Sequence, residues 1–423
     1  MKSLSAMAVT SEWVKRIQIQ FDEKTGLILA AGDLNLSPDK LDYFYGDDCL
    51  LFAGMGDVHI HAREDVSQKN IYKEDFKSAR LAMINGGVTH AGDMPNNPIP
   101  PVDDKSYEDK FQLAFTKAQG DLWLYAGIGP HTRPLSYPVP YKVYMGPSVG
   151  ELFFKDLKTL DETLKHYRGQ QVSFHCEDPE ILDAHENEKH HHLKRPPKAE
   201  VVATRDALML IEKYQLKGKL CHYSTSEGLQ LIRAARARGV EVSIEVTPQH
   251  LYFDMDHMTE DSYRPLQMNP PIRYETDRLV LLEALKKGEI NYLATDHAPH
   301  THEEKSIGHS GLTGLDTYAG FVTWLLKEGI DPRMIAQISS ENPGRFFNTF
   351  LSSWTQIQPE YAGFGKGVGF LAEGYRANFT ILNLNKPLTV EKSFLKTKVG
   401  HSPFLGHCFP GQVEALFVGG KKE

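Results

Sequence analysis

The sequence has few cysteines, no long apolar run and no excess of positive charge, and each of these absences excludes a class of protein. Four cysteines scattered over 423 residues, with no Cys-x-x-Cys pair, form neither a disulfide framework nor a thiolate metal site. No stretch approaches the roughly 20 apolar residues that cross a bilayer. A net charge of −8 provides no basic surface for nucleic acid or an anionic membrane. We therefore expect a cytoplasmic protein that binds neither.

A Gly-rich phosphate turn after the first predicted strand is also missing, which argues against a doubly wound sheet. What is present between residues 50 and 300 is an alternation of short strand-like runs with longer segments of helical apolar spacing. The eight strand-like runs are LLFAGMGDVHIH, GGVTHAGDM, DLWLYAGIGP, YKVYMG, QVSFHCED, KLCHYST, VSIEVTP and NYLATDHAP. Helical spacing is clearest in KEDFKSARLAMING, KDLKTLDETLKHY, ATRDALMLIEKY, SEGLQLIRAARARG and TDRLVLLEALKKG. Eight alternating units predict an α/β fold, a TIM (β/α)8-type barrel over residues 51–359.

Both ends of the chain carry short strand patterns and turns rather than further βα units. IQIQFDEKTGLILAAG lies near the N-terminus, and YRANFTILNL and GQVEALFVGG lie near the C-terminus. We predict that residues 1–50 and 360–423 together form one small β-rich domain.

Polar side chains fall where the predicted strands end, which is where barrel enzymes carry their chemistry. A His-x-His pair alone is weak evidence, because this composition yields roughly one by chance. Convergence of six residues from five predicted strands is stronger, and it predicts a metal site. The six are His59, His61, Lys142, His175, His222 and Asp296. Imidazole and carboxylate donors suit Zn²⁺ or a similar ion, and His59 and His61 can reach one ion because residues two apart share a strand face.

The order of the motifs along the chain resembles a known family. DVHIHARED, GDMPNNPIPP, YKVYMG, VSFHCED, LCHYST, EVTPQHLYFD, MNPPIRYETDR and ATDHAPHTHEEK look like the successive motifs of dihydroorotases in the amidohydrolase superfamily. The resemblance implies a binuclear centre of two Zn²⁺ ions. His59, His61 and Asp296 would hold the more buried ion, and His175 and His222 the other. An N-carboxylated Lys142 and a hydroxide would bridge them, with Asp296 as the catalytic acid–base.

The same resemblance implies a substrate that carries a carboxylate. Arg63, Asn96 and His300 match the residues that hold this carboxylate, whereas Asn269 and the backbone near Gly314 would read the ring. The implied reaction is the reversible interconversion of L-dihydroorotate and N-carbamoyl-L-aspartate in de novo pyrimidine biosynthesis. A homodimer and association with other enzymes of that pathway stay open.

Departures from the family pattern keep two alternatives open. Asp65-Val66 stands where Pro-Gly is usual, Gln249 where a second His is common, and Thr313 and Asp316 where Pro and Glu are frequent. The chain could instead be a related dihydropyrimidinase, hydantoinase or allantoinase-like enzyme, or a non-catalytic dihydroorotase-like assembly partner.

Single residues also have simpler interpretations. Lys142 could be a solvated strand-edge lysine, Asp296 a helix cap, Arg63 half of a surface ion pair, and Asn96 a turn residue. Ser148 in GPSVG matches the nucleophile-elbow pattern of serine hydrolases, a pattern that chance also supplies. The tract His190 to His192 lies in a polar segment and predicts a solvated loop rather than a metal site.

Overall fold

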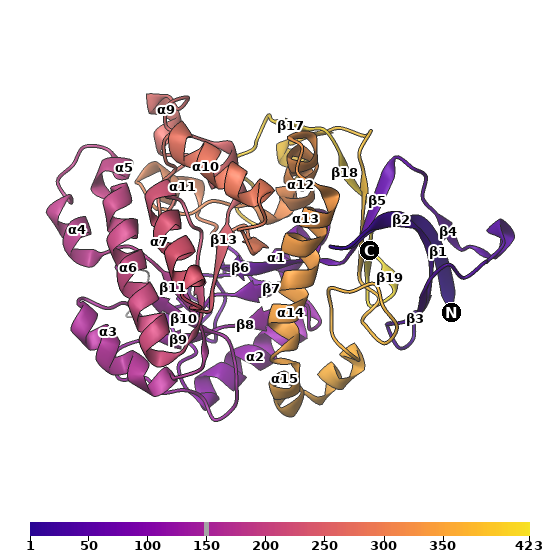
Figure 1. Cartoon of the computed structure of the whole chain (residues 1–423), viewed down its shortest axis with the longest axis horizontal. Coiled ribbons are helices and arrows are strands. Elements are labelled where there is room, and N and C mark those ends of the chain that lie inside the picture. The colour runs from indigo at the N-terminus through magenta and orange to yellow at the C-terminus, as the bar shows by residue number, and fades with distance from the viewer. Residues whose placement is uncertain (148–151) are drawn as a thin grey trace.

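Parallel strands form the barrel in two hydrogen-bonded runs, β6-β7-β8 and β9 through β14. The computed structural model describes residues 1–147 and 152–423. The barrel strands are β6 (Met55–Ile60), β7 (Val88–Asp93), β8 (Leu122–Leu124), β9 (Ala126–Ile128), β10 (Tyr141–Tyr144), β11 (Gln171–His175), β12 (Lys217–Leu220), β13 (Val242–Val246) and β14 (Tyr292–Leu293). Tyr125 alone separates β8 from β9, and a parallel bridge between Ile60 and His297 joins the first strand to the segment after the last. The sheet therefore closes on itself, which confirms the predicted TIM-type barrel (Figure 1).

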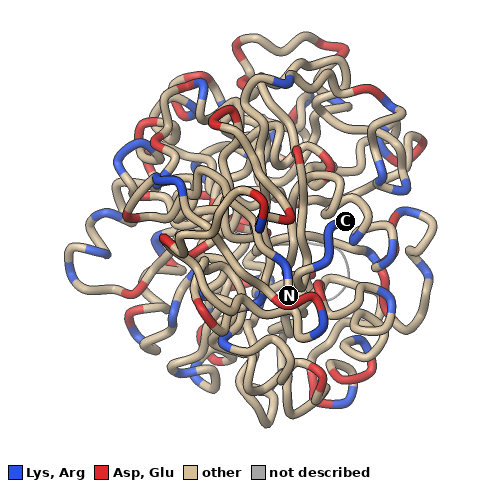
Figure 2. Tube along the Cα trace, turned by 90° about the vertical axis from the view of Figure 1, so that its right-hand side faces the viewer, with Lys and Arg blue, Asp and Glu red and all other residues tan. Residues whose placement is uncertain are grey.

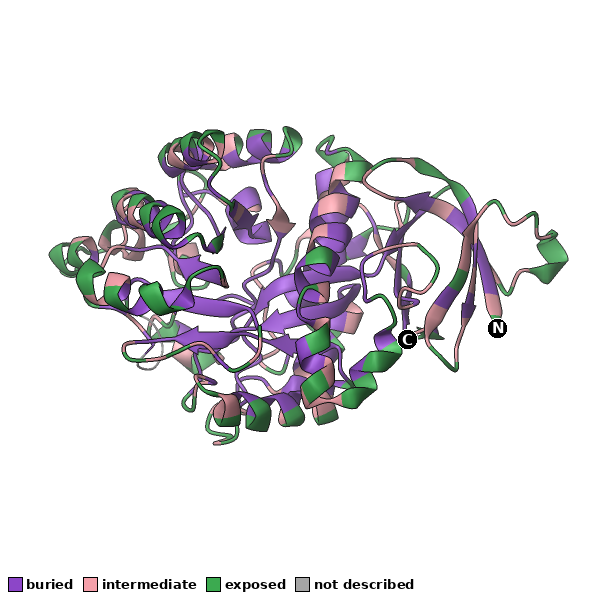
Figure 3. Cartoon of the chain, turned by 60° about the horizontal axis from the view of Figure 1, so that its bottom comes forward, coloured by how far each residue is buried: buried purple, intermediate pink, exposed green. Residues whose placement is uncertain are grey.

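Helices cover the outside of the barrel, and Figure 3 shows buried strands surrounded by helices whose outer faces are exposed. The longer helices are α1 (Phe76–Asn85), α2 (Asp104–Ala118), α3 (Leu157–Leu164), α6 (Pro197–Tyr214), α7 (Ser226–Ala237), α10 (Glu275–Lys286), α12 (Tyr318–Lys327), α14 (Asn342–Asn348) and α15 (Leu351–Ile357). The shorter ones are α4 (Pro179–Ala184), α5 (His191–Lys194), α8 (Pro248–Tyr252), α9 (Glu260–Tyr263), α11 (His302–Ser306) and α13 (Pro332–Ala336). All five helices expected from apolar spacing form. Helix α2 was not among them, although a capping box between Asp103 and Ser106 marks its start.

Strands from both chain ends build a separate eight-stranded sheet that holds both termini (Figure 1). Its strands are β1 (Lys2–Val9), β2 (Val14–Asp22), β3 (Leu27–Gly32), β4 (Tyr43–Phe44), β5 (Cys49–Ala53), β15 (Phe379–Asn383), β18 (Gln412–Val418) and β19 (Lys421–Lys422). Strand β5 lies between β1, to which it is parallel, and β15, to which it is antiparallel. The N-terminal and C-terminal strands thus share one ladder.

Two strands that the sequence predicts as continuous are interrupted, and the prediction is wrong at these points. The first run, LLFAGMGDVHIH, contains β5 of the terminal sheet and β6 of the barrel, with Gly54 between them. A Cβ atom at Gly54 would lie 2.4 Å from Thr89 Oγ1, so only glycine fits where the chain passes from one sheet to the other. The third run breaks at Tyr125, whose hydroxyl donates to the Val58 carbonyl across the barrel.

Between β15 and β18 of the terminal sheet, the C-terminal segment returns over the barrel. Strand β16 (Leu388–Thr389) pairs with β17 (Cys408–Phe409), and the residues between them pack on the barrel. Thr397 Oγ1 donates to Glu74 Oε2 at 2.5 Å, and His401 Nε2 lies 2.6 Å from the His300 carbonyl oxygen. The segment therefore supports residues at the barrel mouth.

Basic and acidic residues are interspersed along the chain, and neither sign dominates the face seen in Figure 2. Among residues 1–147 and 152–423, no helix combines the length and hydrophobicity needed to cross a bilayer.

An aromatic cluster lies between the barrel and its last helices, and it generates a stability prediction. Phe347 is fully buried, and its ring centroid lies 4.6 Å from that of Trp123. Phe347→Ala should lower the free energy of unfolding by about 3–5 kcal/mol, measured by urea denaturation, because the substitution leaves a cavity. The matched control is Phe44→Ala, since Phe44 is 66% exposed; its effect should stay within about 0.5 kcal/mol. Equal losses in the two variants would contradict this description of the core.

Candidate metal centre

The six residues that the sequence singles out meet at the mouth of the barrel. His59 comes from β6 and His61 from just beyond it, Lys142 from β10, His175 from β11, His222 from just beyond β12, and Asp296 from just beyond β14. Five of them line a cavity of about 310 Å³. The complete lining is His59, His61, Arg63, Asn96, Tyr144, Pro147, His175, His222, Asn269, Asp296, Ala298, His300, His309, Ser310 and Gly311. Lys142 is fully buried beside this cavity, where its Nζ lies 2.8 Å from Cys221 Sγ.

The first group of donors combines two imidazoles with a carboxylate. Asp296 Oδ1 lies 3.2 Å from His59 Nε2 and 3.0 Å from His61 Nε2. One donor atom from each of the three residues lies within 4.8 Å of the others. This spacing suits a single metal ion held by nitrogen and oxygen.

The second group contains two more imidazoles. His175 Nδ1 lies 2.9 Å from His222 Nε2, and their ring centroids are 4.7 Å apart. The His222 ring centroid is 5.3 Å from that of His59, so the two groups are contiguous. His222 Nδ1 is buried and has no hydrogen-bond partner in the described part of the chain. His222 Nε2 and His175 Nδ1 face each other, so these two nitrogens are the donors that one metal ion could share.

Burial sets the protonation of these groups. Burial lowers the pKa values of His59, His61 and His222 well below the usual range, with nearby positive charge adding to the shift. The imidazoles therefore stay neutral at pH 7 and keep their lone pairs. Burial raises the pKa of Asp296 to about 7. Four neutral imidazoles, a carboxylate and a buried lysine fit a metal centre.

The backbone at the mouth is held in an uncommon conformation. Arg63, His222 and Asp296 have φ values of 63°, 36° and 48°, in the left-handed region that side chains other than glycine seldom adopt. Such conformations persist where surrounding contacts determine them, and they are concentrated at functional sites.

Two buried glutamates that sequence reasoning missed position the imidazoles. Glu245 in β13 contacts His59 Nδ1, Lys219 Nζ and the His222 backbone amide. Glu245 is the one charged residue in the strand sequence VSIEV, and that isolated charge was the available signal.

The second of these glutamates is Glu177, which accepts from His175 Nε2 at 2.8 Å and from Arg195 Nε at 3.0 Å. Burial alone would raise the pKa of Glu177, but Arg195 and His175 hold it far below its usual range. Metal-binding histidines in proteins usually have such a partner on the second ring nitrogen.

The three residues expected to bind a carboxylate all line the cavity. Arg63 Nη2 lies 3.1 Å from His300 Nε2, and Asn96 Oδ1 lies 2.8 Å from His61 Nδ1. Arg63 is buried rather than part of a surface ion pair, and its Nε donates to the Pro299 carbonyl at 3.2 Å. The guanidinium therefore has few competing acceptors besides a ligand.

Of the other residues singled out in the sequence, some line the cavity and others do not. Asn269 lines the cavity, and its Oδ1 lies 2.9 Å from His191 Nε2. The expectation of a solvated loop at His190 to His192 is therefore wrong for His191, which begins α5 and supports Asn269. Gly314 is not among the lining residues, and its amide donates to His297 Nδ1 at 3.2 Å. Ser148 lies outside the described residues.

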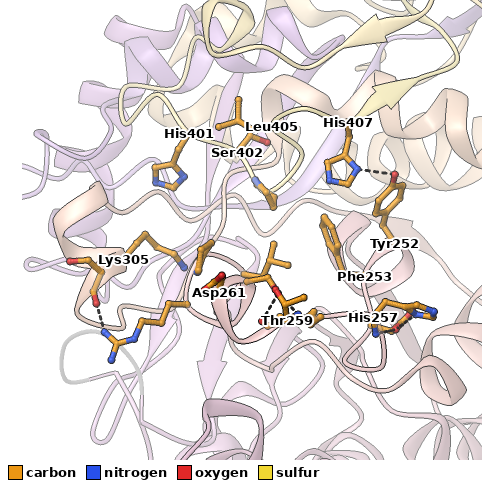
Figure 4. Close-up of a pocket in the computed structure, with 18 of the residues that line it drawn as sticks. Tyr252, Phe253, His257, Thr259, Asp261, Lys305, His401, Ser402, Leu405 and His407 are labelled. Atoms are coloured by element: carbon orange, nitrogen blue, oxygen red, sulfur yellow. Dashed lines mark hydrogen bonds and ion pairs between the residues drawn. The ribbon is translucent and has the colours of Figure 1, made fainter.

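A larger cavity of about 940 Å³ lies beside helix α11, which follows Asp296 in the chain (Figure 4). It lies among Tyr252, Phe253, Leu405 and Lys305, and its lining is mainly apolar. Lys305 Nζ donates to the carbonyls of Gln267 and Gly311 at 2.7 and 3.0 Å. Gly311 also lines the smaller cavity, so Lys305 fixes part of the wall of that cavity. The smaller cavity, where the imidazoles converge, is the one suited to catalysis.

Solved structures with this fold include hydantoinases. L-Hydantoinase (dihydropyrimidinase) from Arthrobacter aurescens matches with a TM-score of 0.85 over 99% of this chain and 95% of that chain, at 22% sequence identity. D-Hydantoinase (dihydropyrimidinase) from Thermus sp. matches with a TM-score of 0.83 over 100% of this chain and 95% of that chain, at 19% identity. At this level of identity the similarity shows the fold. No family model matches the chain.

Curated relatives are more similar in sequence. Dihydroorotase from Pyrococcus furiosus is 30% identical over 381 residues, which cover 88% of this chain and 81% of the relative. Dihydroorotase from Thermococcus kodakarensis is 31% identical over 400 residues, which cover 93% and 88%. Dihydroorotase from Listeria welshimeri is 28% identical over 432 residues, which cover 94% of each chain.

The barrel, its imidazole and carboxylate cluster and these relatives define a hydrolase of the amidohydrolase superfamily that acts on carbon–nitrogen bonds of cyclic amides. Within that class, the chain belongs to the dihydroorotase family. The resemblance found in the sequence motifs is thereby confirmed. Members of this superfamily bind metals, and the described residues supply suitable donor groups.

The buried pair of Lys219 and Glu245 generates a prediction about the support of this site. Both side chains are fully buried and form an ion pair. Lys219→Met should lower the free energy of unfolding by about 3–5 kcal/mol, because it leaves the Glu245 carboxylate buried without its cation. Urea denaturation of the purified protein measures this loss.

Lys213→Met is the matched control, since Lys213 pairs with Asp161 while 50% exposed. Its effect should be below about 1 kcal/mol. A smaller loss at Lys219 than at Lys213 would show that the buried pair does not stabilise this wall of the barrel.

Proposed function

We propose that this chain catalyses the reversible interconversion of L-dihydroorotate and N-carbamoyl-L-aspartate with two zinc ions, as a step of pyrimidine biosynthesis. The observation that carries the proposal is the buried Arg63 beside His300, in the same small cavity as the imidazole cluster. A buried guanidinium favours an anionic substrate, because the carboxylate supplies both charge and paired acceptors. Hydantoin and dihydrouracil lack that carboxylate and would leave the guanidinium without a partner.

In this proposal His59, His61 and Asp296 would hold one ion, and His175 and His222 would hold the other. Lys142 would carry a carbamate, formed when its amine adds CO₂ and releases a proton, and this carboxylate would be a further metal ligand. When bound, the ions lower the pKa of water and polarise the scissile carbonyl.

The residues of the chain perform the remaining steps. Arg63, Asn96 and His300 hold the substrate carboxylate, and Asn269 contacts the ring; Gly314, outside the cavity lining, supports His297 instead. Asp296 takes the proton from water as its oxygen adds to the carbonyl carbon. The ring C–N bond then breaks, and Asp296 delivers the proton to the leaving nitrogen, which restores the carboxylate.

Substrate choice tests the proposed reaction. The purified enzyme should turn over L-dihydroorotate with higher kcat/KM than dihydrouracil, hydantoin or allantoin, and a metal chelator should remove the activity. Arg63→Gln should lower kcat/KM for dihydroorotate about 10- to 100-fold, because a charge-assisted hydrogen bond contributes roughly 1.5–3 kcal/mol. Steady-state kinetics on all four substrates measure both effects.

Dihydrouracil is the internal control for the Arg63 variant, because it has no carboxylate to lose. Its turnover should change little. A wild-type preference for dihydrouracil or hydantoin would reject the proposed substrate and favour a related cyclic amidohydrolase. Absence of bound zinc together with absence of turnover would favour a non-catalytic assembly partner.

Dependence on bicarbonate tests the carbamate at Lys142. Metal-free enzyme reconstituted with zinc in CO₂-free buffer should recover little activity, and added bicarbonate should raise the recovery and the zinc content together. Lys142→Ala should bind less zinc and should not respond to bicarbonate, since it has no amine to carboxylate. The control is Lys213→Met, whose half-exposed lysine lies on helix α6 and pairs with Asp161, and which should respond as the wild type does. Full recovery without bicarbonate would contradict the carbamate.

A further inference from the structure

Tyr144 ends strand β10 and contributes to the wall of the metal-site cavity. Its side chain is 3% exposed, and its hydroxyl is buried with no hydrogen-bond partner among residues 1–147 and 152–423. Leaving a buried polar atom unpartnered destabilises a folded protein, so each such atom calls for a reason. The position of Tyr144 in the cavity wall explains the missing partner, because a bound ligand can supply the acceptor.

The phenol lies beside the groups proposed to react. Tyr144 and Lys142 point to the same side of β10, since residues two apart on a strand share a face. Lys142 Nζ lies 5.2 Å from the Tyr144 ring centroid, and the His175 ring centroid lies 6.0 Å from it. A tyrosine hydroxyl carries its proton at neutral pH, so this unpartnered atom of a cavity-lining residue is a hydrogen-bond donor.

We propose that the Tyr144 hydroxyl donates a hydrogen bond to the carbonyl oxygen of the cyclic amide under attack, which makes Tyr144 a further catalytic residue. This inference rests on the proposed hydrolysis of a cyclic amide in this cavity. As the oxygen of water adds to the carbonyl carbon, the C=O electron pair moves onto the carbonyl oxygen, and Tyr144 stabilises the charge. When the ring C–N bond breaks, the pair reforms the carbonyl and the proton stays on Tyr144.

Tyr144→Phe tests the hydroxyl while keeping the ring. We expect kcat to fall about 100-fold with little change in KM, because the hydrogen bond strengthens only as charge develops. Tyr141→Phe is the matched control in the same strand, since its hydroxyl accepts from the Leu135 amide at 2.8 Å, outside the cavity lining. This control should keep the kcat and zinc content of the wild type. An unchanged kcat in Tyr144→Phe, or a rise in KM alone, would overturn the proposal.

Thermal unfolding of the metal-free proteins supplies a second readout that does not depend on turnover. Tyr144→Phe should unfold at the wild-type temperature or above, because it removes a polar atom that has no partner. Tyr141→Phe should unfold at a lower temperature, because it breaks a formed hydrogen bond. An equal decrease in the two variants would mean that Tyr144 has a structural partner within the protein, and the inference would fail.

The proposal for the substrate and the proposal for Tyr144 can be rejected independently of each other. If the wild type hydrolyses hydantoin or dihydrouracil instead of dihydroorotate, the proposed substrate is wrong, and the ratio of kcat between wild type and Tyr144→Phe on that compound still decides the inference. If the zinc-loaded wild type turns over no cyclic amide, both proposals are rejected.

Discussion

Closure of the barrel between its first and last strands is the constraint on which the site depends. The Asp57 carboxylate accepts from the His59 amide at 3.0 Å and from the Thr295 amide at 3.1 Å. This single buried group links the strand that carries the histidine pair to the segment that carries Asp296. Parallel strands end at one rim, so closure brings together side chains that are far apart in the chain. Without it, Asp296 could not lie 3.2 Å from His59.

The buried charged residues around the imidazole cluster contribute more to the orientation of the ligand side chains than to the free energy of unfolding. Asp93 pairs with Lys110 at 2.6 Å and accepts from the Ala62 amide at 2.7 Å, directly after His61. Glu245 and Glu177 contact imidazoles in the same way on other strands. Removing two charges from water costs about as much as their attraction returns, so such pairs contribute little net free energy. Their effect is to fix the orientation of ligand side chains, which a metal centre requires.

The C-terminal segment between β16 and β17 packs against the loops at the mouth of the barrel. His401 Nε2 lies 2.6 Å from the His300 carbonyl oxygen, and Thr313 Oγ1 donates to the His401 carbonyl at 2.6 Å. Lys305 holds the neighbouring loop through three backbone carbonyls. His300 is therefore supported by a C-terminal segment that carries none of the proposed metal ligands.

The barrel could be predicted from the sequence because strand and helix periodicities are local, and the family could be predicted because ordered motifs survive at about 30% identity. The sequence also marked His59, His61, Lys142, His175, His222 and Asp296, since strand ends can be read from it. Only the tertiary structure decided which atoms are partners. The contact of Glu245 with His59, the support of Asn269 by His191 and the unpartnered hydroxyl of Tyr144 depend on distances across the barrel. The break at Gly54 depends on Thr89 from another strand, and no local pattern encodes such a contact.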